Sequence, residues 1–433
     1  MKATLGRLWA IAGMTLLEAS RRKVFTILLL FGLALISSIL FFPSVEVDAR
    51  LRLIEVWALR ASAIFTAIVG LFLAGFSLPQ DFETKRIYLI VTKPISKPLV
   101  FLGRYLGYAL LLAVFILTMG AVTTVFLRTV RLFSGSKFPP LVAYPRIRAG
   151  DFSAPGGTKL EEQQAERAVG FGPENALVWK FTGLRRSSFD DQARLQIRLI
   201  FGAVADPYRA SGTVDVRIVN PSGGIHRTQL SMNTNEEQEI SFPAGLIGGD
   251  GVLQVELRAV DSDGFIAASE GWLILYEKSM LFELAFARGL ALILLQSMIV
   301  LSITLMSSTF LSAPLSILLG ILLYLVGSIH GYVREGSRDI DRSLAEIRLS
   351  PHAEKEHTPE GLPPLLLRFS TETSKLVLAA VPDFANFDFS VWLLKDHAVS
   401  WSEIAGAGAK AFLPIAVMVV LGTLLMLFKD FDR

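Results

Sequence analysis

The side chains best placed to act together are the charged and apolar residues that follow Pro79. Two acidic residues precede a mixture of basic and apolar ones, in the order Asp81, Glu83, Lys85, Arg86, Ile87, Ile90, Val91, Lys93, Pro94, Ser96 and Lys97. Acidic residues are favoured in the first turn of a helix, where its dipole is positive. The three branched apolar side chains would share one helix face, and Lys93-Pro94 would end the helix. The pattern predicts a short amphipathic helix that can bind a groove of a protein partner, and an ordinary connecting loop fits it equally well.

Groups for catalysis or metal binding are scarce in the chain. It contains no cysteine, which excludes disulfides, thiolate metal sites and cysteine nucleophiles. It contains no Gly-Lys dipeptide, so a phosphate-binding loop of the form Gly-x-x-x-x-Gly-Lys-Ser/Thr is impossible. No Ser/His/Asp set and no set of two histidines and a carboxylate occurs at usable spacing in the apolar segments. We therefore expect no catalytic residue, no metal site and no cofactor bound by this chain.

Two patterns in the middle of the chain could bind a ligand. Asp261, Asp263 and Glu270 could bind calcium, but the further ligands that a calcium loop needs are absent, and a hairpin turn explains them better. Trp179 and Trp272 could stack on a sugar, although such residues more often fill the core of a β domain. We expect the turn and the core.

Long apolar segments of the chain indicate helices that cross a membrane. Of the 433 residues 52% are hydrophobic and 19% are charged, and the mean hydropathy is +0.50. A helix needs about 20 mostly apolar residues to cross a membrane. We predict six spans: Val24–Phe42, Ala61–Leu78 with an extension past Arg60, Tyr105–Leu127, two within Gly289–Ile329, and Ala411–Phe428. A turn near Ser307-Ser308 and Ala313-Pro314 would separate the fourth span from the fifth. The net charge of +3 is too small to indicate a nucleic-acid partner.

Lysine and arginine are concentrated on one side of these spans, and such an excess marks the cytoplasmic side. That side has Lys2, Arg7, Arg21, Arg22, Lys23, Lys85, Arg86, Lys93, Lys97, Arg104, Lys429 and Arg433. The one short loop on the opposite side has Arg50, Arg52 and Arg60. Both termini and the connection between the second and third spans are therefore expected in the cytoplasm. Residues 128–281 and 330–410 would lie outside.

Residues 1–23 are expected to form an amphipathic helix before the first span. Apolar side chains recur at helical spacing, at Leu5, Leu8, Trp9, Ala12, Leu16 and Ala19. Arg7 and Glu18 fall on the other side. We expect the helix to lie in the cytoplasmic interface of the lipid bilayer, anchored by Trp9, Arg21, Arg22 and Lys23. A simple extension of the first span is the alternative.

The outside segment 128–281 changes to strand-like patterns. Apolar and polar residues alternate with a period of two in Leu195–Phe201, Val214–Ile218 and Leu253–Leu257. Three turn sequences separate such runs: Asn220–Gly224, Gly248–Gly251 and Asp261–Gly264. We predict an antiparallel β-sandwich over residues 170–278, preceded by a loop-rich segment, Ser134–Gly172.

The second outside segment, residues 330–410, is expected to contain polar helices at Arg338–Leu349 and Pro364–Ala380. His352 and His357 stand close to two acidic residues, but histidines five positions apart do not share a helix face well. Solvated charge explains them better than a metal site.

Two regions of the chain, Asp81–Gly107 and Val381–Asp388, resemble the permeases of type-2 ABC exporters. Thr92-Lys93-Pro94-Ile95-Ser96-Lys97 and Leu102-Gly103-Arg104-Tyr105-Leu106-Gly107 are similar to the coupling-helix region of that family and to the start of its third span. Thr84-Lys85-Arg86 departs mildly from the small polar pair that is usual there. Val381-Pro382-Asp383-Phe384-Ala385-Asn386-Phe387-Asp388 resembles a segment before the last span in the subgroup that includes the permease of nitrous-oxide-reductase maturation. The similarity covers residues 1–127 and 282–433, and leaves the β domain as an insertion.

The resemblance implies a function for the loop 79–104 that follows the second span. Permeases of this family dimerise, and each coupling helix docks on a cytoplasmic ATPase subunit that binds ATP and magnesium. Closure of the ATPases then rocks the spans and exports or extracts a substrate. In this chain the docking residues would be Asp81, Glu83, Lys85, Arg86, Ile87, Ile90, Lys93, Pro94, Ser96 and Lys97. The alternative is a mechanotransmitting permease that regulates an extracytoplasmic protein partner and transports nothing.

Overall fold

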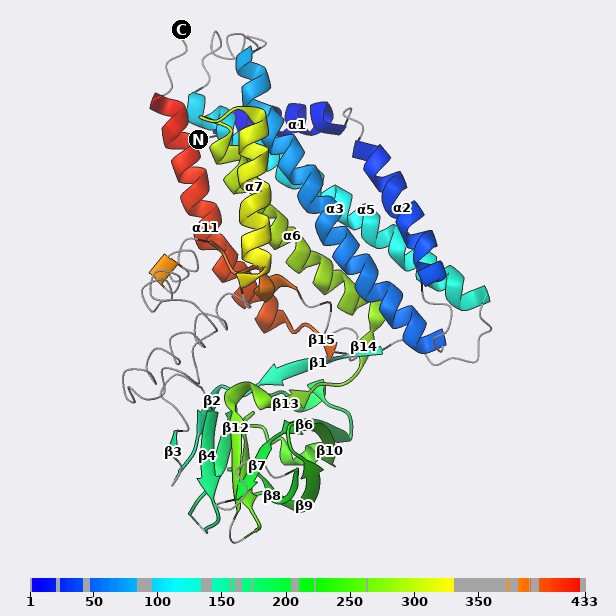
Figure 1. The fold of residues 1–433 in the computed structure, drawn as a ribbon, viewed down its shortest axis with the longest axis vertical. Coiled ribbons are helices and arrows are strands. Elements are labelled where there is room, and N and C mark those ends of the chain that lie inside the picture. The colour runs from blue at the N-terminus through cyan, green and yellow to red at the C-terminus, as the bar shows by residue number, and fades with distance from the viewer. Residues whose placement is uncertain are drawn as a thin grey trace, which may run out of the picture. The chain divides into compact units, whose positions relative to one another are not determined.

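The computed structural model describes most of the chain, in two compact units (Figure 1). It describes residues 2–20, 24–41, 47–83, 96–133, 142–155, 158–159, 166–172, 174–203, 210–221, 223–261, 264–330, 372–373, 381–388, 390 and 397–428. The helical unit comprises Met1–Pro139, Phe286–Lys395 and Trp401–Arg433, and the β unit comprises Pro140–Ala285 and Asp396–Ser400.

The helical unit contains the apolar segments of the sequence. Its helices are α1 (Lys2–Ser20), α2 (Val24–Phe41), α3 (Val47–Glu83), α5 (Lys97–Phe133), α6 (Phe282–Ser307), α7 (Ala313–Ser328) and α11 (Trp401–Phe428), with a 3₁₀ turn, η5 (Phe384–Phe387). Within the described residues, four helical stretches are long and apolar enough to cross a membrane: Leu53–Glu83, Lys97–Val130, Phe282–Ser307 and Trp401–Phe428. The apolar stretches of α2 and α7 are shorter. These lengths and compositions are consistent with a membrane protein.

Several helices extend beyond the predicted spans: α5 begins at Lys97 and α6 at Phe282, before the predicted Tyr105 and Gly289. The turn between α6 and α7 lies at the expected position, between Ser307 and Ala313, and α3 extends upstream of Arg60 as expected. The last helix begins at Trp401, however, and not at Ala411. Its first turns contain Glu403 and Lys410, so hydrophobicity alone does not reveal them. The predicted polar helices of segment 330–410 lie outside the described residues, apart from Glu372 and Thr373, and so do His352 and His357.

Small residues allow the helices of this unit to approach one another closely. A Cβ atom on Gly75 of α3 would lie 2.3 Å from the Ile317 side chain of α7. A Cβ atom on Gly422 of α11 would lie 2.2 Å from the Phe101 ring of α5. Real Cβ atoms do not come so close to other heavy atoms, so a larger residue at either position would push two helices apart.

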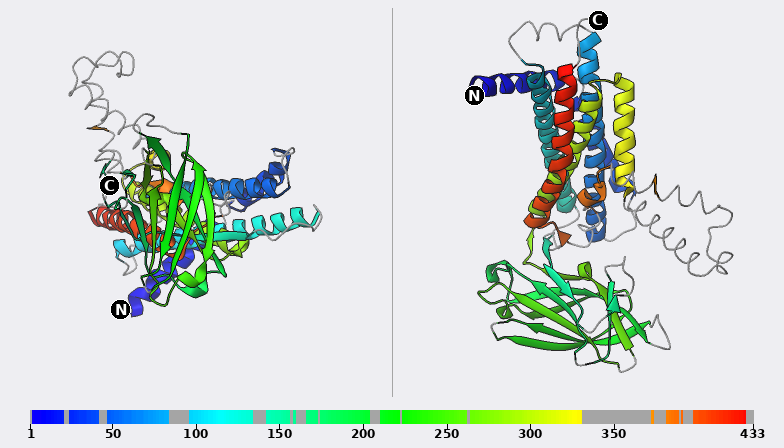
Figure 2. Two further views of the ribbon diagram at one scale, coloured as in Figure 1. Left: turned by 90° about the horizontal axis from the view of Figure 1, so that it is seen from below. Right: turned by 90° about the vertical axis from the view of Figure 1, so that its left-hand side faces the viewer.

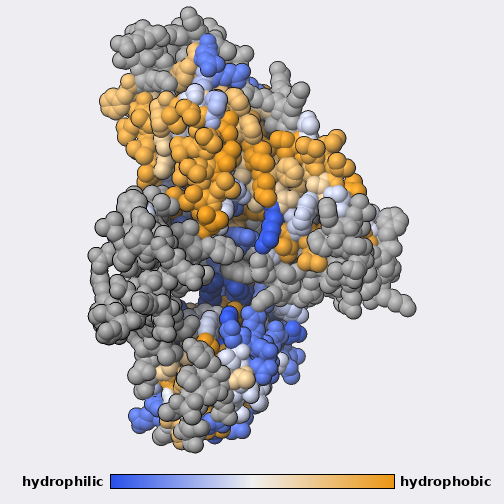
Figure 3. Space-filling view, viewed as in Figure 1, coloured by the Kyte–Doolittle hydropathy of each residue, from blue (hydrophilic) through white to orange (hydrophobic). Residues whose placement is uncertain are grey.

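The outward surface of the helical unit is formed by large apolar side chains. Figure 3 shows them as a broad hydrophobic band over the helices. Members of this surface include Leu29, Leu33, Ile64, Leu117, Val125, Leu318, Phe412 and Leu413. A patch of this extent facing water would be unusual for a soluble protein.

The β unit is built from three sheets. Its strands are β1 (Val142–Arg148), β2 (Asp151–Ser153), β3 (Thr158–Lys159), β4 (Glu166–Gly170), β5 (Leu177–Phe181), β6 (Gln192–Arg198), β7 (Ile200–Ala203), β8 (Ser211–Val219), β9 (Ile225–Asn233), β10 (Glu237–Pro243), β11 (Leu253–Ala259), β12 (Gly264–Ser269), β13 (Leu273–Tyr276), β14 (Met280–Leu281) and β15 (His397–Ala398). The strand orders are β10-β6-β13-β1-β14 with β15 also on β1, β2-β5-β11-β8-β9, and β3-β4-β12-β7. The β1–β15 pair is parallel, and the other pairs are antiparallel.

The predicted alternation correctly identifies the inward side chains of these sheets. Leu195 and Ile197 of β6, Val216 of β8 and Val255 of β11 are fully buried in one core that also contains Trp179. Residues Asn220–Gly224 form the predicted turn, and β8 and β9 pair across it along their whole lengths. The sequence therefore predicts the side chains that face this core, although Gln196 of β6 and Asp215 of β8, expected on the outer faces, are buried as well.

Three details of the predicted β domain are wrong. Ser134–Gly172 contains strands β1 to β4 and is not loop-rich, so the sheets begin well before residue 170. Asp261–Gly264 is not the turn of a hairpin, because β11 and β12 belong to different sheets. The alternating run Leu195–Phe201 is divided at Leu199 into β6 and β7, which also lie in different sheets. Strands of two or three residues have too little length to show a period.

Candidate functional site

The candidate functional site is the connection between α3 and α5, which contains the predicted coupling residues. α3 ends at Glu83 and α5 begins at Lys97. Asp81, Glu83, Ser96 and Lys97 are placed by the structure. The other predicted coupling residues, Lys85, Arg86, Ile87, Ile90, Lys93 and Pro94, lie outside the described residues, and so does the predicted short helix beyond Glu83.

The predicted position of the two acidic residues is wrong. They were expected in the first turn of a new helix, but they lie in the last turn of α3, which continues past Pro79. The end of a helix carries a partial negative charge, so its dipole does not favour an acidic residue there. Glu83 is exposed, whereas Asp81 is only 3% exposed and needs a partner of opposite charge.

Arg104 of α5 is that partner. Its guanidinium forms an ion pair with the Asp81 carboxylate, and Arg104 itself is only 6% exposed. Nη1 of Arg104 also donates a hydrogen bond of 2.7 Å to the hydroxyl of Ser77, and the Tyr108 hydroxyl lies 3.5 Å from the same nitrogen. A buried pair of this kind connects the last turn of α3 with the first turns of α5. The ion pair therefore holds together the end of α3 and the start of α5, the two helices that residues 84–95 connect.

Two glycines beside Arg104 bring α1 against α5. A Cβ atom on Gly103 would lie 2.5 Å from the Ile11 side chain. One on Gly107 would lie 2.7 Å from the carbonyl oxygen of Ala12 and from Cβ of Thr15. Glycines four residues apart share one helix face, which allows a second helix to approach the backbone. The sequence Leu102–Gly107 thus serves two contacts, with Arg104 toward α3 and the two glycines toward α1.

α1 itself has one buried face of small residues and an outer surface with large apolar side chains. Ala12, Thr15 and Ala19 are buried. Trp9 is 57% exposed, and Leu5, Met14 and Leu17 are exposed to a similar or greater extent. Figure 2 shows α1 running crosswise to the long helices of this unit. The interfacial anchor at Trp9 stays a prediction, and Arg21, Arg22 and Lys23 lie outside the described residues.

α5 begins at Lys97, before the predicted start of the third span at Tyr105. The carbonyl oxygen of Ser96 accepts hydrogen bonds from the amides of Leu99 (3.0 Å) and Val100 (3.3 Å). Pro98 occupies the first turn, where a missing N–H costs no hydrogen bond. Ser96 is exposed and Lys97 is half-buried, so both remain near the surface beside the coupling segment.

The second motif that supports the resemblance packs on the end of α7. Phe384 of η5 lies against Tyr324, with ring centroids 5.8 Å apart, and its ring fills the space where Gly327 has no side chain. Asp383 Oδ2 lies 3.5 Å from Nδ1 of His330. These contacts hold the segment that precedes Asp388 in place.

The structure gives no support to the two ligand sites considered for the β unit, a calcium site at the acidic residues and a sugar site at the two tryptophans. Trp179 is fully buried, stacks on Phe152 at 4.6 Å, and donates a hydrogen bond of 3.1 Å to the carbonyl of Glu270. Trp272 is half-buried beneath the guanidinium of Arg198. Within the part of the chain that the structure describes, no three His, Cys, Asp or Glu residues are grouped to hold a metal ion. Asp263 lies outside that part.

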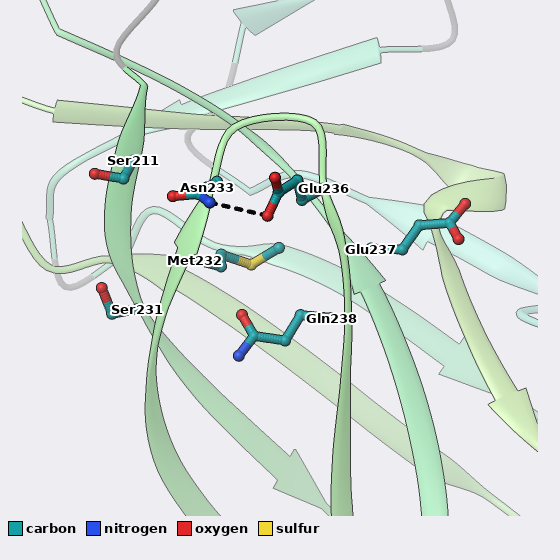
Figure 4. Close-up of a pocket in the computed structure, with 7 residues that line it drawn as sticks. All are labelled: Ser211, Ser231, Met232, Asn233, Glu236, Glu237 and Gln238. Carbon is teal, nitrogen blue, oxygen red and sulfur yellow. Dashed lines mark hydrogen bonds between the residues drawn. The ribbon is translucent and has the colours of Figure 1, made fainter.

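A polar cavity at the turn between β9 and β10 was not predicted. It has a volume of about 400 Å³, is open to solvent, and is lined by Ser211, Ser231, Met232, Asn233, Glu236, Glu237 and Gln238. Asn233 Nδ2 donates a hydrogen bond of 2.9 Å to Glu236 Oε2, and Glu237 points away from that pair (Figure 4). The residues that line this cavity come from strands of two sheets, so no single run of sequence indicates the cavity.

Comparison with known proteins adds no family for this chain: no family model matches it, and no curated protein does. The residues themselves therefore have to support a function. In the sequence Arg104 was counted as a topology signal and as part of the motif Leu102–Gly107, and its burial was not predicted. Its position one helical turn before Tyr108, in a run of otherwise apolar residues, is the signal by which its burial could have been recognised.

Proposed function

We propose that this chain is the membrane subunit of an ATP-driven exporter of the type-2 ABC class. A separate ATPase subunit in the cytoplasm would bind ATP and magnesium and hydrolyse the nucleotide. This chain would couple hydrolysis to the export or extraction of a substrate and would have no catalytic residue of its own. The proposal includes six spans, cytoplasmic termini, a permease dimer and location in the inner membrane of a prokaryote.

The observation that carries the proposal is the set of contacts around Leu102–Gly107. The residues that resemble the family motif are the ones that connect three helices: Arg104 pairs with Asp81 of α3, and Gly103 and Gly107 pack on α1. A segment that receives force from an ATPase must end on helices that are held together. These contacts supply that support at both ends of residues 84–95.

The direct test is to place charges on the apolar stripe of the coupling segment. Interfaces concentrate their binding energy in a few buried residues, whose truncation costs about 2 kcal/mol or more. The double variant Ile87→Asp/Ile90→Asp should therefore lose the ATPase on co-purification from the native membrane, while the chain itself inserts at its normal level. Lys85→Ala/Arg86→Ala should have a milder, salt-dependent effect, because exposed ion pairs contribute about 1 kcal/mol or less.

The matched control is Gln254→Asp/Arg258→Asp on β11 of the β unit, which should leave ATPase association unchanged. Full ATPase association and hydrolysis in the Ile87→Asp/Ile90→Asp variant would show that the segment is only a linker. The proposed function would then be wrong.

A second candidate, mechanotransmission to an extracytoplasmic partner, is favoured by the connections of one sheet. β1 follows α5 in the chain, β14 directly precedes α6, and β15 closely precedes α11. All three strands are neighbours, because β14 and β15 both pair with β1. Movement of any of the three helices would thus be passed to the same sheet. ATP hydrolysis stimulated by an added substrate in reconstituted vesicles would favour export over this candidate.

A further inference from the structure

The strand β15 is too short to be held in its sheet by backbone hydrogen bonds alone. It consists of His397 and Ala398, which pair in parallel with Tyr144 and Pro145 of β1. α11 begins at Trp401, directly after this segment. Side chains must therefore help to hold β15.

A chain of side-chain hydrogen bonds, which starts at the exposed Glu237 and is buried beyond it, ends on β15. Gln196 Nε2 of β6 donates to Glu237 Oε2 of β10 at 2.8 Å, and the Tyr276 hydroxyl of β13 lies 2.5 Å from Gln196 Oε1. The same hydroxyl lies 2.7 Å from Nε2 of His397. Gln196, Tyr276 and His397 are each buried. The four side chains thus cross the sheet from β10 to β15.

The chemistry of the groups fixes the direction of every bond in this chain. The Glu237 carboxylate can only accept, so the amide nitrogen of Gln196 faces it and the amide oxygen faces Tyr276. That oxygen also only accepts, so Tyr276 gives it its single proton. The Tyr276 oxygen must then accept from His397, whose Nε2 carries a proton. Burial, with Glu239 and Glu237 nearby, raises the pKa of Tyr276, so the phenol keeps the proton that the chain requires.

We propose that the chain Glu237–Gln196–Tyr276–His397 is a latch that holds β15 in the sheet. His397 acts in it as a donor through Nε2. The latch makes the residues directly before α11 a fixed part of the β unit. It starts at Glu237, which also lines the open cavity between β9 and β10, and it does not depend on the proposed exporter function.

The test is amide hydrogen exchange on the full-length protein in detergent micelles. Tyr276→Phe keeps the ring but leaves Gln196 and His397 facing each other without the bridging hydroxyl. Amides of residues 397–400 should then exchange about ten-fold faster, because a buried group that loses its partner destabilises the local structure. His397→Leu should give the same result.

Two matched variants test the latch and its direction. Tyr144→Phe removes a hydroxyl from β1 that has no hydrogen-bond partner among the described residues, and it should leave the exchange unchanged. His397→Gln places an amide nitrogen near the position of Nε2 and should restore much of the protection that His397→Leu loses. The proposal is wrong if Tyr276→Phe and His397→Leu exchange no faster at residues 397–400 than Tyr144→Phe. Equal loss in His397→Gln and His397→Leu would overturn the donor role of His397.

Discussion

The two units differ most in the side chains that they expose. The core of the β unit is filled by large residues such as Trp179, Phe181 and Phe242, and the outer faces of strands such as β9 are largely polar. The helical unit also buries large residues such as Phe31 and Phe101, but several of its close helix contacts are made at glycines, including Gly75 and Gly422, and further large apolar residues point outward. Buried polar and charged groups, Asp81 and Arg104 among them, lie inside.

The exposed surfaces of the two units differ because each suits a different solvent. In water, burial of large apolar side chains is the main source of stability, so they fill the core. In lipid, outward apolar side chains cost nothing, and helices associate through close packing and polar contacts. The surface of the helical unit therefore fits a hydrocarbon environment and that of the β unit fits water. Each of the three changes below tests one element of this contrast.

The largest effect is expected from breaking the buried pair inside the helical unit. Removing one member of a buried ion pair leaves an uncompensated charge and costs about 3–5 kcal/mol. Asp81→Ala and Arg104→Ala should each lower the free energy of unfolding in detergent micelles by this amount.

Replacement of both members provides the control for that experiment. The double variant Asp81→Leu/Arg104→Met removes both charges and should recover much of the lost stability, since well-packed apolar residues can replace a buried pair. A double variant no more stable than the single ones would mean that the charges do not interact as the geometry indicates.

A smaller effect is expected from a charge on the outer surface of the same unit. Leu117 lies midway along α5 and is 67% exposed. If this surface faces lipid, Leu117→Arg should reduce membrane insertion, because an arginine at the centre of a span costs about 2.5–3.5 kcal/mol. Carbonate-resistant membrane association is the measurement. The same change at the exposed Gln229 of β9 should have no effect, and equal membrane association for both variants would contradict the contrast between the two surfaces.

The sequence predicts the inner faces of both units better than their limits. Apolar runs identify the helices, but Pro79 does not end α3, and the first ten residues of α11 are too polar for a span. Alternation identifies the buried residues of β6, β8 and β11, yet it does not indicate which sheet a strand joins. Tyr276 and His397 are 121 residues apart in the chain, so only the fold brings them together. For the same reason the motif around Arg104 could be recognised in the sequence, while its partner Asp81 was assigned to a different helix.

The smallest effect is expected where α1 crosses α5. Gly107→Leu would force its side chain against the backbone of Ala12 and the side chain of Thr15, and overpacking of this kind costs about 1–3 kcal/mol. The matched control is Gly13→Leu on α1 itself, because a Cβ atom there would meet no described atom within 4 Å. Thermal unfolding in detergent should show a lower transition temperature for Gly107→Leu only. The same substitution at Gly107 should also loosen α1 from α5, which increases amide exchange in residues 11–19. If both variants unfold and exchange alike, the glycines do not determine the approach of the two helices, and the helical unit is not packed through its small residues at this crossing.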